Sequence, residues 1–136
     1  MPDIKIIYSG SLRTKATHTQ SGNTIITDAP TDNNGRGKYF SPTDLVASAL
    51  GSCILTIMAI VSERHSLSIK GTYCKVSKLM DTAPRKISSI IVKIFFPCII
   101  SDKMKKILEQ AANSCPVHHS LHIDIKKEVT FHYPKS

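Results

Sequence analysis

The sequence predicts an α+β fold in which antiparallel sheet packs against helices, and three observations support this prediction. Residues 3–29 alternate apolar and polar side chains in short runs that Gly10 and Gly22 separate. Residues 41–62 then form a segment of helical length with almost no charge. Alternating runs return in the second half of the chain, with one further helical pattern between them. Strands in groups, with helices between the groups, are typical of the α+β class.

Length and composition predict a single domain that spans residues 1–136. The chain is 41% hydrophobic and 21% charged, as in ordinary globular proteins, and it has no repeat or Pro- and Gly-rich linker. The formal charge of +8 is spread thinly, and the sequence has no Trp and few other aromatic residues. Nucleic-acid binding usually needs a basic stripe, often with aromatic side chains. We therefore expect no nucleic-acid partner.

The first three strands are expected at residues 3–9, 12–19 and 23–29. Short turn segments separate them, so they should form an antiparallel meander. Residues 30–40 follow as a polar loop that is rich in turn-forming residues and should be exposed.

The helix that follows has the clearest start signal in the sequence. Ser41 is a favourable N-cap, Pro42 fits the first helical position, and Asp44 completes a capping box. The helix should end near Ser62. Its 17 uncharged residues, 45–61, reach the lower limit of a membrane span, but small polar residues interrupt them and no aromatic belt flanks them. We therefore expect a buried core helix and no membrane association.

The second half of the chain predicts three more strands and one more helix. Strands are expected at residues 68–80 and 86–97, followed by a helix at residues 101–113 with apolar residues at helical spacing. Pro116 then opens a short helical turn, and residues 121–133 alternate as a closing strand. The predicted order is βββαββαβ.

Four cysteines and the start of the sequence bear on the cellular compartment. The first ten residues lack the basic start and apolar stretch of a signal peptide, which predicts a cytoplasmic protein with reduced thiols. Cys53 lies about three turns into the apolar helix, where a cysteine is most often a small apolar filler. Cys115 precedes Pro116 at a helical start, where backbone N–H groups favour a thiolate. Cys74 and Cys98 have no role that the sequence supports.

The histidines near Cys115 leave a metal site as an alternative. Cys115, His118, His119 and His122 have spacings that can place several of them on one helical face, as in a zinc site. No CxxC motif supplies a second pair of ligands. His118 and His119 are also consistent with a solvent-facing helix start. From these residues alone, a redox pair, a zinc site and structural cysteines all remain open.

Two cysteine motifs resemble those of the OsmC/Ohr family, the osmotically inducible and organic hydroperoxide resistance proteins. The first is SPTDLVASALGSC, which ends at Cys53, and the second is CPVHHSLH, which begins at Cys115. The earlier segment GSLRTKATHTQSG is similar to the hairpin that opens many members. The resemblance covers residues 8–133, and the two motifs are specific when they occur together in this order.

The resemblance implies both an architecture and a chemistry. It implies an intertwined homodimer with antiparallel sheets wrapped around long central helices and active sites at the dimer interface. It implies that Cys53 is the peroxidatic thiol and Cys115 the resolving thiol, and that Arg13 activates the thiolate, with Arg36 as the alternative. The implied enzyme reduces organic or lipid hydroperoxides with electrons from a dithiol reductant, such as a lipoylated protein. It needs no metal or other cofactor.

One position departs from the family pattern. Members that reduce hydroperoxides carry a glutamate after the proline that opens the helix, where it orients the arginine; this chain has Thr43 there. Asp44 follows, but its shorter side chain is expected in the capping box. The departure indicates a divergent member. A thiol peroxidase is the leading hypothesis, and a non-catalytic dimer that binds a small apolar ligand in the interfacial pocket is the alternative.

Overall fold

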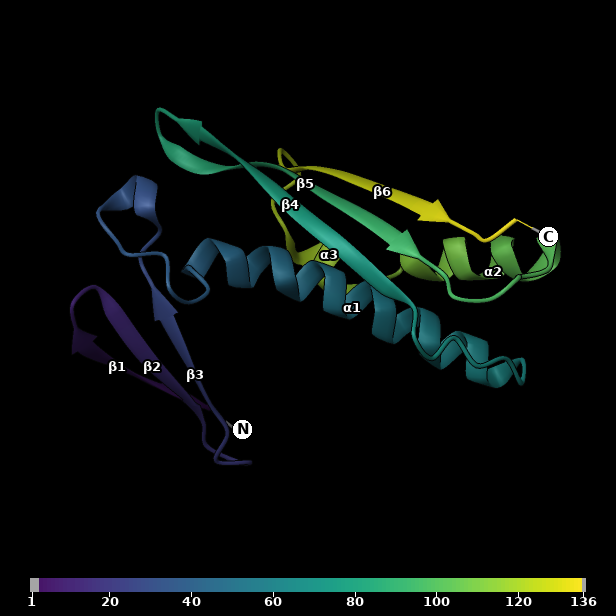
Figure 1. The fold of residues 1–136 in the computed structure, drawn as a ribbon, viewed down its shortest axis with the longest axis horizontal. Helices are drawn as coiled ribbons and strands as arrows, with labels where there is room; N and C mark the ends of the chain where they lie inside the picture. The colour runs from purple at the N-terminus through teal and green to yellow at the C-terminus, as the bar shows by residue number, and fades with distance from the viewer. Residues whose placement is uncertain (1–2, 136) are drawn as a thin grey trace. The chain divides into compact units, whose positions relative to one another are not determined.

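The computed structural model describes residues 3–135, and the chain folds into two compact units, Met1–Val46 and Ala47–Ser136. Figure 1 labels the helices and strands of both units. The expectation of one domain over residues 1–136 stays a prediction. The α+β class and the predicted order of elements are confirmed; the helical turn expected at Pro116 is present as a short helix, and a 3₁₀ turn at Thr31–Asn33 is added.

The N-terminal unit is built on a three-stranded antiparallel sheet, as the alternating pattern predicted. Its strands are β1 (Ile4–Gly10), β2 (Arg13–His18) and β3 (Thr24–Asp28), which neighbour one another in that order. The turn between β1 and β2 uses three residues with positive φ, beginning with Gly10 at 86°. A short 3₁₀ turn, η1 (Thr31–Asn33), interrupts the predicted polar loop.

Helix α1 (Pro42–Arg64) begins with the predicted capping box. The Asp44 backbone N–H donates to Ser41 Oγ at 3.1 Å, and the Ser41 N–H donates to Asp44 Oδ2 at 2.9 Å. These reciprocal bonds satisfy two backbone donors that a helix start otherwise leaves unpaired. By length and composition α1 would also span a membrane, yet it packs against the core of the C-terminal unit.

The C-terminal unit contains a second three-stranded sheet, of β4 (Tyr73–Thr82), β5 (Arg85–Phe95) and β6 (Lys126–His132). Strands β4 and β5 are antiparallel, but β6 runs parallel to β5, so the expectation of purely antiparallel sheets is wrong for this strand. The reason is the connection: α2 (Asp102–Ala112) and α3 (Pro116–Ser120) carry the chain back before β6 begins.

Two predicted strand boundaries also differ. The strand expected at residues 121–133 begins only at Lys126, because the residues after α3 form a turn. The strand expected at residues 68–80 begins only at Tyr73, because the preceding residues form a turn with Gly71 at a φ of 93°.

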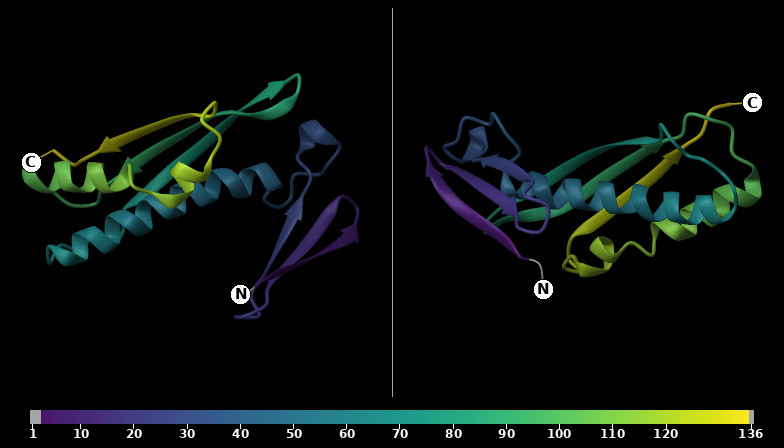
Figure 2. Two further views of the ribbon diagram at one scale, coloured as in Figure 1. Left: turned by 180° about the vertical axis from the view of Figure 1, so that it is seen from behind. Right: turned by 90° about the horizontal axis from the view of Figure 1, so that it is seen from below.

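Helices cover one face of this second sheet (Figures 1 and 2). The inner positions of β5 are fully buried, and α1 packs its own buried side chains in the same core. The fully buried aliphatic side chains of this core are Leu50, Ile54, Met58, Ile90, Val92, Ile94 and Leu108. This packing fixes the face of α1 that meets the sheet and leaves a neighbouring face toward α3.

Candidate active site

Cys53 and Cys115 come together in the C-terminal unit. Cys53 is half-buried in the middle of α1, and Cys115 is fully buried as the N-cap of α3. The two side chains are close enough to interact, and the neighbouring Cys53 is one of the causes that raise the pKa of Cys115; both are free thiols. Figure 1 shows the start of α3 beside α1. Of the interpretations that the sequence left open, a redox pair is the one that this contact favours.

The environment of Cys115 holds its thiol in the protonated form. The His118 backbone N–H donates to its Sγ at 3.4 Å, and the Val117 N–H also contributes, as expected at a helical start. Burial of the side chain and the contact with Cys53 act more strongly in the opposite direction, so that the pKa of Cys115 is raised above its ordinary value. The backbone N–H groups at the helical start thus favour the thiolate, as the sequence indicated, but burial outweighs them.

Arg13 belongs to the N-terminal unit, where β2 and β3 place it directly opposite Asp28. Its Nε lies 3.5 Å from Asp28 Oδ2, and Tyr39 covers the guanidinium with its ring centroid 5.1 Å away. The Asp28 side chain is fully buried, and that of Arg13 is 25% exposed. Arg36, the alternative arginine, is exposed in the loop after η1. The role of Arg13 toward Cys53 stays a prediction.

Asp28 and Tyr39 were not singled out in the sequence. The Asp28 carboxylate also accepts the Lys38 N–H at 3.1 Å, and the Asp28 N–H donates to the Phe40 carbonyl, so this residue ties the loop to the sheet. Counting the predicted hairpin from its turn would have placed Asp28 near Arg13, since strand partners share one face. Asp28 was not recognised in this way because an aspartate at a strand end is more typical of a turn.

Thr43, the position of the departure from the family pattern, lies half-buried in the first turn of α1. Its Oγ1 lies 3.3 Å from Ser41 Oγ. Asp44 bonds with Ser41 in the capping box, as expected. These contacts of Ser41, Thr43 and Asp44 therefore stabilise the start of α1.

The three histidines do not assemble with Cys115 around a common centre. His118 packs edge-on against His119, with ring centroids 5.7 Å apart, and His122 instead lies 3.6 Å from Asp124. Within residues 3–135, no group of three or more His, Cys, Asp or Glu side chains is arranged to hold a metal ion. Burial, with the nearby Lys127 and His119, lowers the pKa of His118, so that its ring is neutral at physiological pH.

The remaining cysteines lie in separate places. Cys74 is on β4 and faces α1, where a Cβ added to Gly51 would lie 3.1 Å from its Sγ. Burial raises the pKa of Cys74. Cys98 follows β5 and is half-buried.

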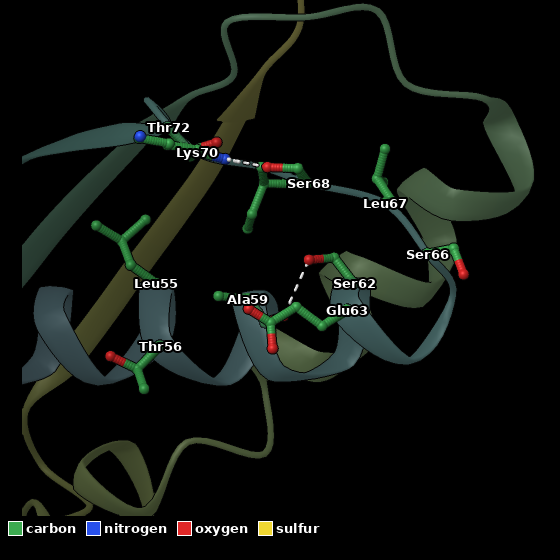
Figure 3. Close-up of a pocket in the computed structure, with 11 residues that line it drawn as sticks. Leu55, Thr56, Ala59, Ser62, Glu63, Ser66, Leu67, Ser68, Lys70 and Thr72 are labelled. Carbon is green, nitrogen blue, oxygen red and sulfur yellow. Dashed lines mark hydrogen bonds between the residues drawn. The ribbon is translucent and has the colours of Figure 1, made fainter.

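The C-terminal unit also has a cavity of about 750 Å³ along the second half of α1 (Figure 3). Apolar side chains such as Leu55 and Leu67 line it together with several hydroxyl groups, and neither Cys53 nor Cys115 does. Figure 3 shows the hydrogen bond from the Lys70 N–H to Ser68 Oγ at its edge, at 3.3 Å.

Comparisons with known proteins agree with this architecture. Residues 35–130 match the family model described as OsmC-like protein. A solved structure from Psychrobacter arcticus, described as a putative osmotic stress induced and detoxification response protein, is 46% identical, with 97% of this chain and 96% of that chain covered and a TM-score of 0.93. No curated protein matches the chain.

More distant solved structures share the fold. An organic hydroperoxide resistance protein OsmC from Legionella pneumophila is 12% identical, with a TM-score of 0.77 over 97% of this chain and 96% of that chain. The organic hydroperoxide resistance protein OhrB of Bacillus subtilis is 14% identical, with a TM-score of 0.69 over 96% of this chain and 97% of that chain. At these identities the likeness extends to the fold alone.

Proposed function

This chain belongs to the OsmC-like protein family, and we propose that it is a thiol-dependent peroxidase that reduces organic hydroperoxides through Cys53 and Cys115. The observation that carries this proposal is the interaction between two free thiols from distant parts of the sequence. A disulfide needs its two sulfurs to come within bonding reach, and neighbouring thiols are the starting point for it.

The reaction balances with a dithiol as the source of electrons. The Cys53 thiolate attacks the distal oxygen of the hydroperoxide, the O–O bond breaks, and the alkoxide takes up a proton to leave as an alcohol. Cys53 is then a sulfenic acid, and Cys115 attacks its sulfur, so that water leaves and a disulfide forms. A dithiol reductant, such as a lipoylated protein, exchanges with this disulfide and restores both thiols. The two cysteines carry the electrons, so the cycle needs no metal or flavin.

The environments of the two cysteines suit different roles. Cys53 is only half-buried, which gives a hydroperoxide access to its sulfur. Cys115 is fully buried with a raised pKa, so it stays a thiol until the sulfenic acid has formed beside it. Arg13 is the residue that activates the Cys53 thiolate in this proposal, since a guanidinium is always charged at physiological pH.

The working form is a homodimer in the cytoplasm. Strand β1 exposes three large side chains on one face of its sheet, Ile4, Ile6 and Tyr8, each more than 60% exposed. Only 33% of the most apolar stretch of α1 is buried within one chain. Apolar surface of this extent supports a second copy that covers it. A reducing compartment suits an enzyme whose resting state has two adjacent free thiols.

The cavity along α1 favours one alternative function. Its apolar lining fits a non-catalytic dimer that binds a small apolar ligand, in a site without either cysteine of the pair. Alkylation of Cys53 across a range of pH separates the two functions. An activated thiol is alkylated at a pH well below the ordinary cysteine pKa of about 8.5. An unperturbed thiol reacts only near or above that pH.

Mass spectrometry after one equivalent of an organic hydroperoxide tests the proposed peroxidase. We expect the loss of two hydrogens, mapped to a disulfide between Cys53 and Cys115. With a dithiol reductant present, Cys53→Ser should abolish hydroperoxide consumption, and Cys115→Ser should complete one turnover and then stall.

Cys98→Ser is the matched control, because it removes a half-buried thiol that follows β5 and is not a member of the proposed pair. It should behave like the unaltered protein. Full steady-state activity in the Cys53→Ser variant would refute the proposal, and so would a disulfide that maps to other cysteines.

A further inference from the structure

Strands β4, β5 and β6 carry most of the positive charge of the chain. Together they contain seven Lys and Arg residues and two acidic residues, while the whole protein has a formal charge of +8. Helices cover one face of their sheet (Figure 2), and Cys74, Ile94 and Phe131 pack in the core on that side. Because side chains alternate along a strand, the residues next to these three point to the opposite, outer face of the sheet.

Three aromatic rings stack across this outer face. Tyr73, Phe95 and His132 are register partners on the three strands. The ring centroids of Tyr73 and Phe95 lie 5.0 Å apart and those of Phe95 and His132 lie 4.7 Å apart, in both cases with nearly parallel planes. Phe95 is the central ring of this column, whereas Tyr73 and His132 are exposed on the edge strands β4 and β6. Each end of the column therefore offers a ring on which a further planar group stacks.

A pair of lysines lies next to the ring column. Lys75 and Lys93 are both exposed and are register partners, two residues along β4 and β5 from the rings. The next residue in their row, on β6, is the neutral Thr130. Lys75 Nζ lies 5.8 Å from the ring centroid of Phe95, so the charges and the rings form one continuous surface. Like charges directly opposite each other on a sheet are unfavourable, and an anion bound beside them offsets this repulsion.

The two acidic residues of these strands each have a different lysine beside them. Glu128 Oε1 lies 2.8 Å from Lys126 Nζ, and Asp81 is the register partner of Lys86 near the turn between β4 and β5. Their charges are therefore offset locally, at positions outside the row of Lys75 and Lys93.

We propose that this outer face binds single-stranded nucleic acid. A polynucleotide repeats a phosphate and a planar base, and the face presents two lysines beside a column of rings. Phosphates lie against Lys75 and Lys93, and bases extend the ring column at Tyr73 or His132. The two rows are about 7 Å apart along the strands, which one nucleotide spans. A double helix stacks its own bases, so only a single strand can offer them to these rings.

The proposal replaces the expectation, drawn from the sequence, that the chain has no nucleic-acid partner. That expectation depended on the thin spread of charge and the small number of aromatic residues along the chain. Strand register brings the lysines of β4 and β5 together and adds a ring from each of the three strands. An acidic peptide would use the lysines alone and would leave the ring column without a role.

Fluorescence anisotropy with labelled 12-nucleotide oligo(dT) and oligo(U) tests the proposal. We expect micromolar binding of at least one of them, weakening as salt is added. Replacing both lysines, Lys75→Gln with Lys93→Gln, should raise the Kd at least about tenfold at low salt. It should also reduce the slope of log affinity against log salt by about 1.4, as expected for two lost phosphate contacts. The matched control is Lys103→Gln with Lys106→Gln, which removes two exposed lysines of α2 and should change the Kd less than about twofold.

A second set of variants tests the rings. Tyr73→Ala should raise the Kd about fivefold or more, because stacking of one base is lost, and Tyr73→Phe should leave it unchanged. His132→Ala removes the ring at the other end of the column and gives a second test should Tyr73→Ala not fold.

Three outcomes would overturn the inference: no micromolar binding of either oligonucleotide, equal weakening by the α2 control, or unchanged binding when the end rings are removed. The last outcome, with loss of binding in the Lys75 and Lys93 variant, would identify a site for acidic polymers in general, such as polyglutamate. The inference is independent of the thiol chemistry. Cys53→Ser should bind the oligonucleotides like the unaltered protein, so that failure of one proposal does not decide the other.

Discussion

Cys115 is subject to opposing influences, and their balance decides how it behaves. Two backbone N–H groups favour its thiolate, while burial and the neighbouring Cys53 favour the neutral thiol and prevail. A helical start followed by proline is visible in the sequence, so the N–H groups could be predicted. Burial of the sulfur and its contact with a second thiol depend on tertiary packing, which no local pattern contains.

The raised pKa of Cys115 predicts a pH-dependent resolution step. Below that pKa the thiolate fraction rises about tenfold with each pH unit, so formation of the disulfide from the Cys53 sulfenic acid should accelerate about tenfold per unit between about pH 7 and 9. The rate is measured in a single turnover by quenching with a reagent that traps sulfenic acids. The Cys98→Ser variant should follow the same profile, and a rate that stays flat over this interval would contradict the prediction.

For individual residues, the sequence was informative where it contained a specific motif. The family motifs predicted that Cys53 and Cys115 act together, and the structure brings the two thiols into contact, while their roles stay predictions. From the residues alone the pairing was open, because periodicity does not tell which face of α1 meets α3. Asp28 was missed because its partner lies on another strand, at a distance in sequence that only the hairpin register reveals.

Among the elements, capped helices and alternating strands were predictable, and strand neighbours were not. The capping box at Ser41 is encoded within four residues, so the start of α1 agrees with the prediction. The alternation of β6 predicts a strand but is the same whether that strand runs parallel or antiparallel to β5. Its direction depends on how α2 and α3 lead the chain back, which is a property of the whole unit.

Gly51 allows α1 to approach β4 closely. A Cβ at this position would lie 2.8 Å from Val76 Cγ2 and 3.1 Å from Cys74 Sγ. Valine is stiff because it is branched at Cβ, so it cannot turn aside easily. We expect Gly51→Ala to lower the free energy of unfolding by about 1–2 kcal/mol, because overpacking outweighs the gain of roughly 1 kcal/mol in helix propensity.

Urea unfolding measures this effect, and two variants control for it. Ser52→Ala, at the exposed neighbouring position, should change the free energy of unfolding by less than about 0.5 kcal/mol. Combining Gly51→Ala with Val76→Ala should cost less than the sum of the single changes, since the smaller side chain leaves room for the new methyl group. A Gly51→Ala protein that is as stable as the original would show that α1 can move away from β4.

At the scale of the molecule, the two units differ in how well one chain covers their apolar side chains. The C-terminal unit has a continuous core in which side chains of α1, β5 and α2 are fully buried. In the N-terminal sheet, by contrast, Thr27 and Asp28 are the only buried residues within β1–β3. Alternating patterns predicted these strands correctly, because alternation indicates that one face of a strand is apolar. It does not indicate whether that face packs against the same chain or against a second copy.

This uncovered face predicts the oligomeric state. Ile6, Ala16 and Ile25 lie in one row across β1, β2 and β3, and Ile6 and Ile25 are 64% and 50% exposed. A stable protein interface buries about 1,600 Å² in total, with an apolar centre, and this row provides such a centre. We expect the protein to sediment as a dimer at micromolar concentration. We expect Ile6→Lys to raise the dissociation constant by at least about tenfold, because a buried lysine without a partner is costly.

Sedimentation velocity over a range of concentrations measures both outcomes, and Ile123→Lys is the matched control. Ile123 is 88% exposed in the loop before β6, so the same change of chemistry there should leave the dissociation constant unaffected. If Ile6→Lys dissociates the dimer and Ile123→Lys does not, the first sheet carries the interface, and hydroperoxide consumption by the separated chains then shows whether one chain suffices for catalysis. A protein that remains monomeric at all concentrations would contradict this interface, because the apolar row of the first sheet would then face water in the working form.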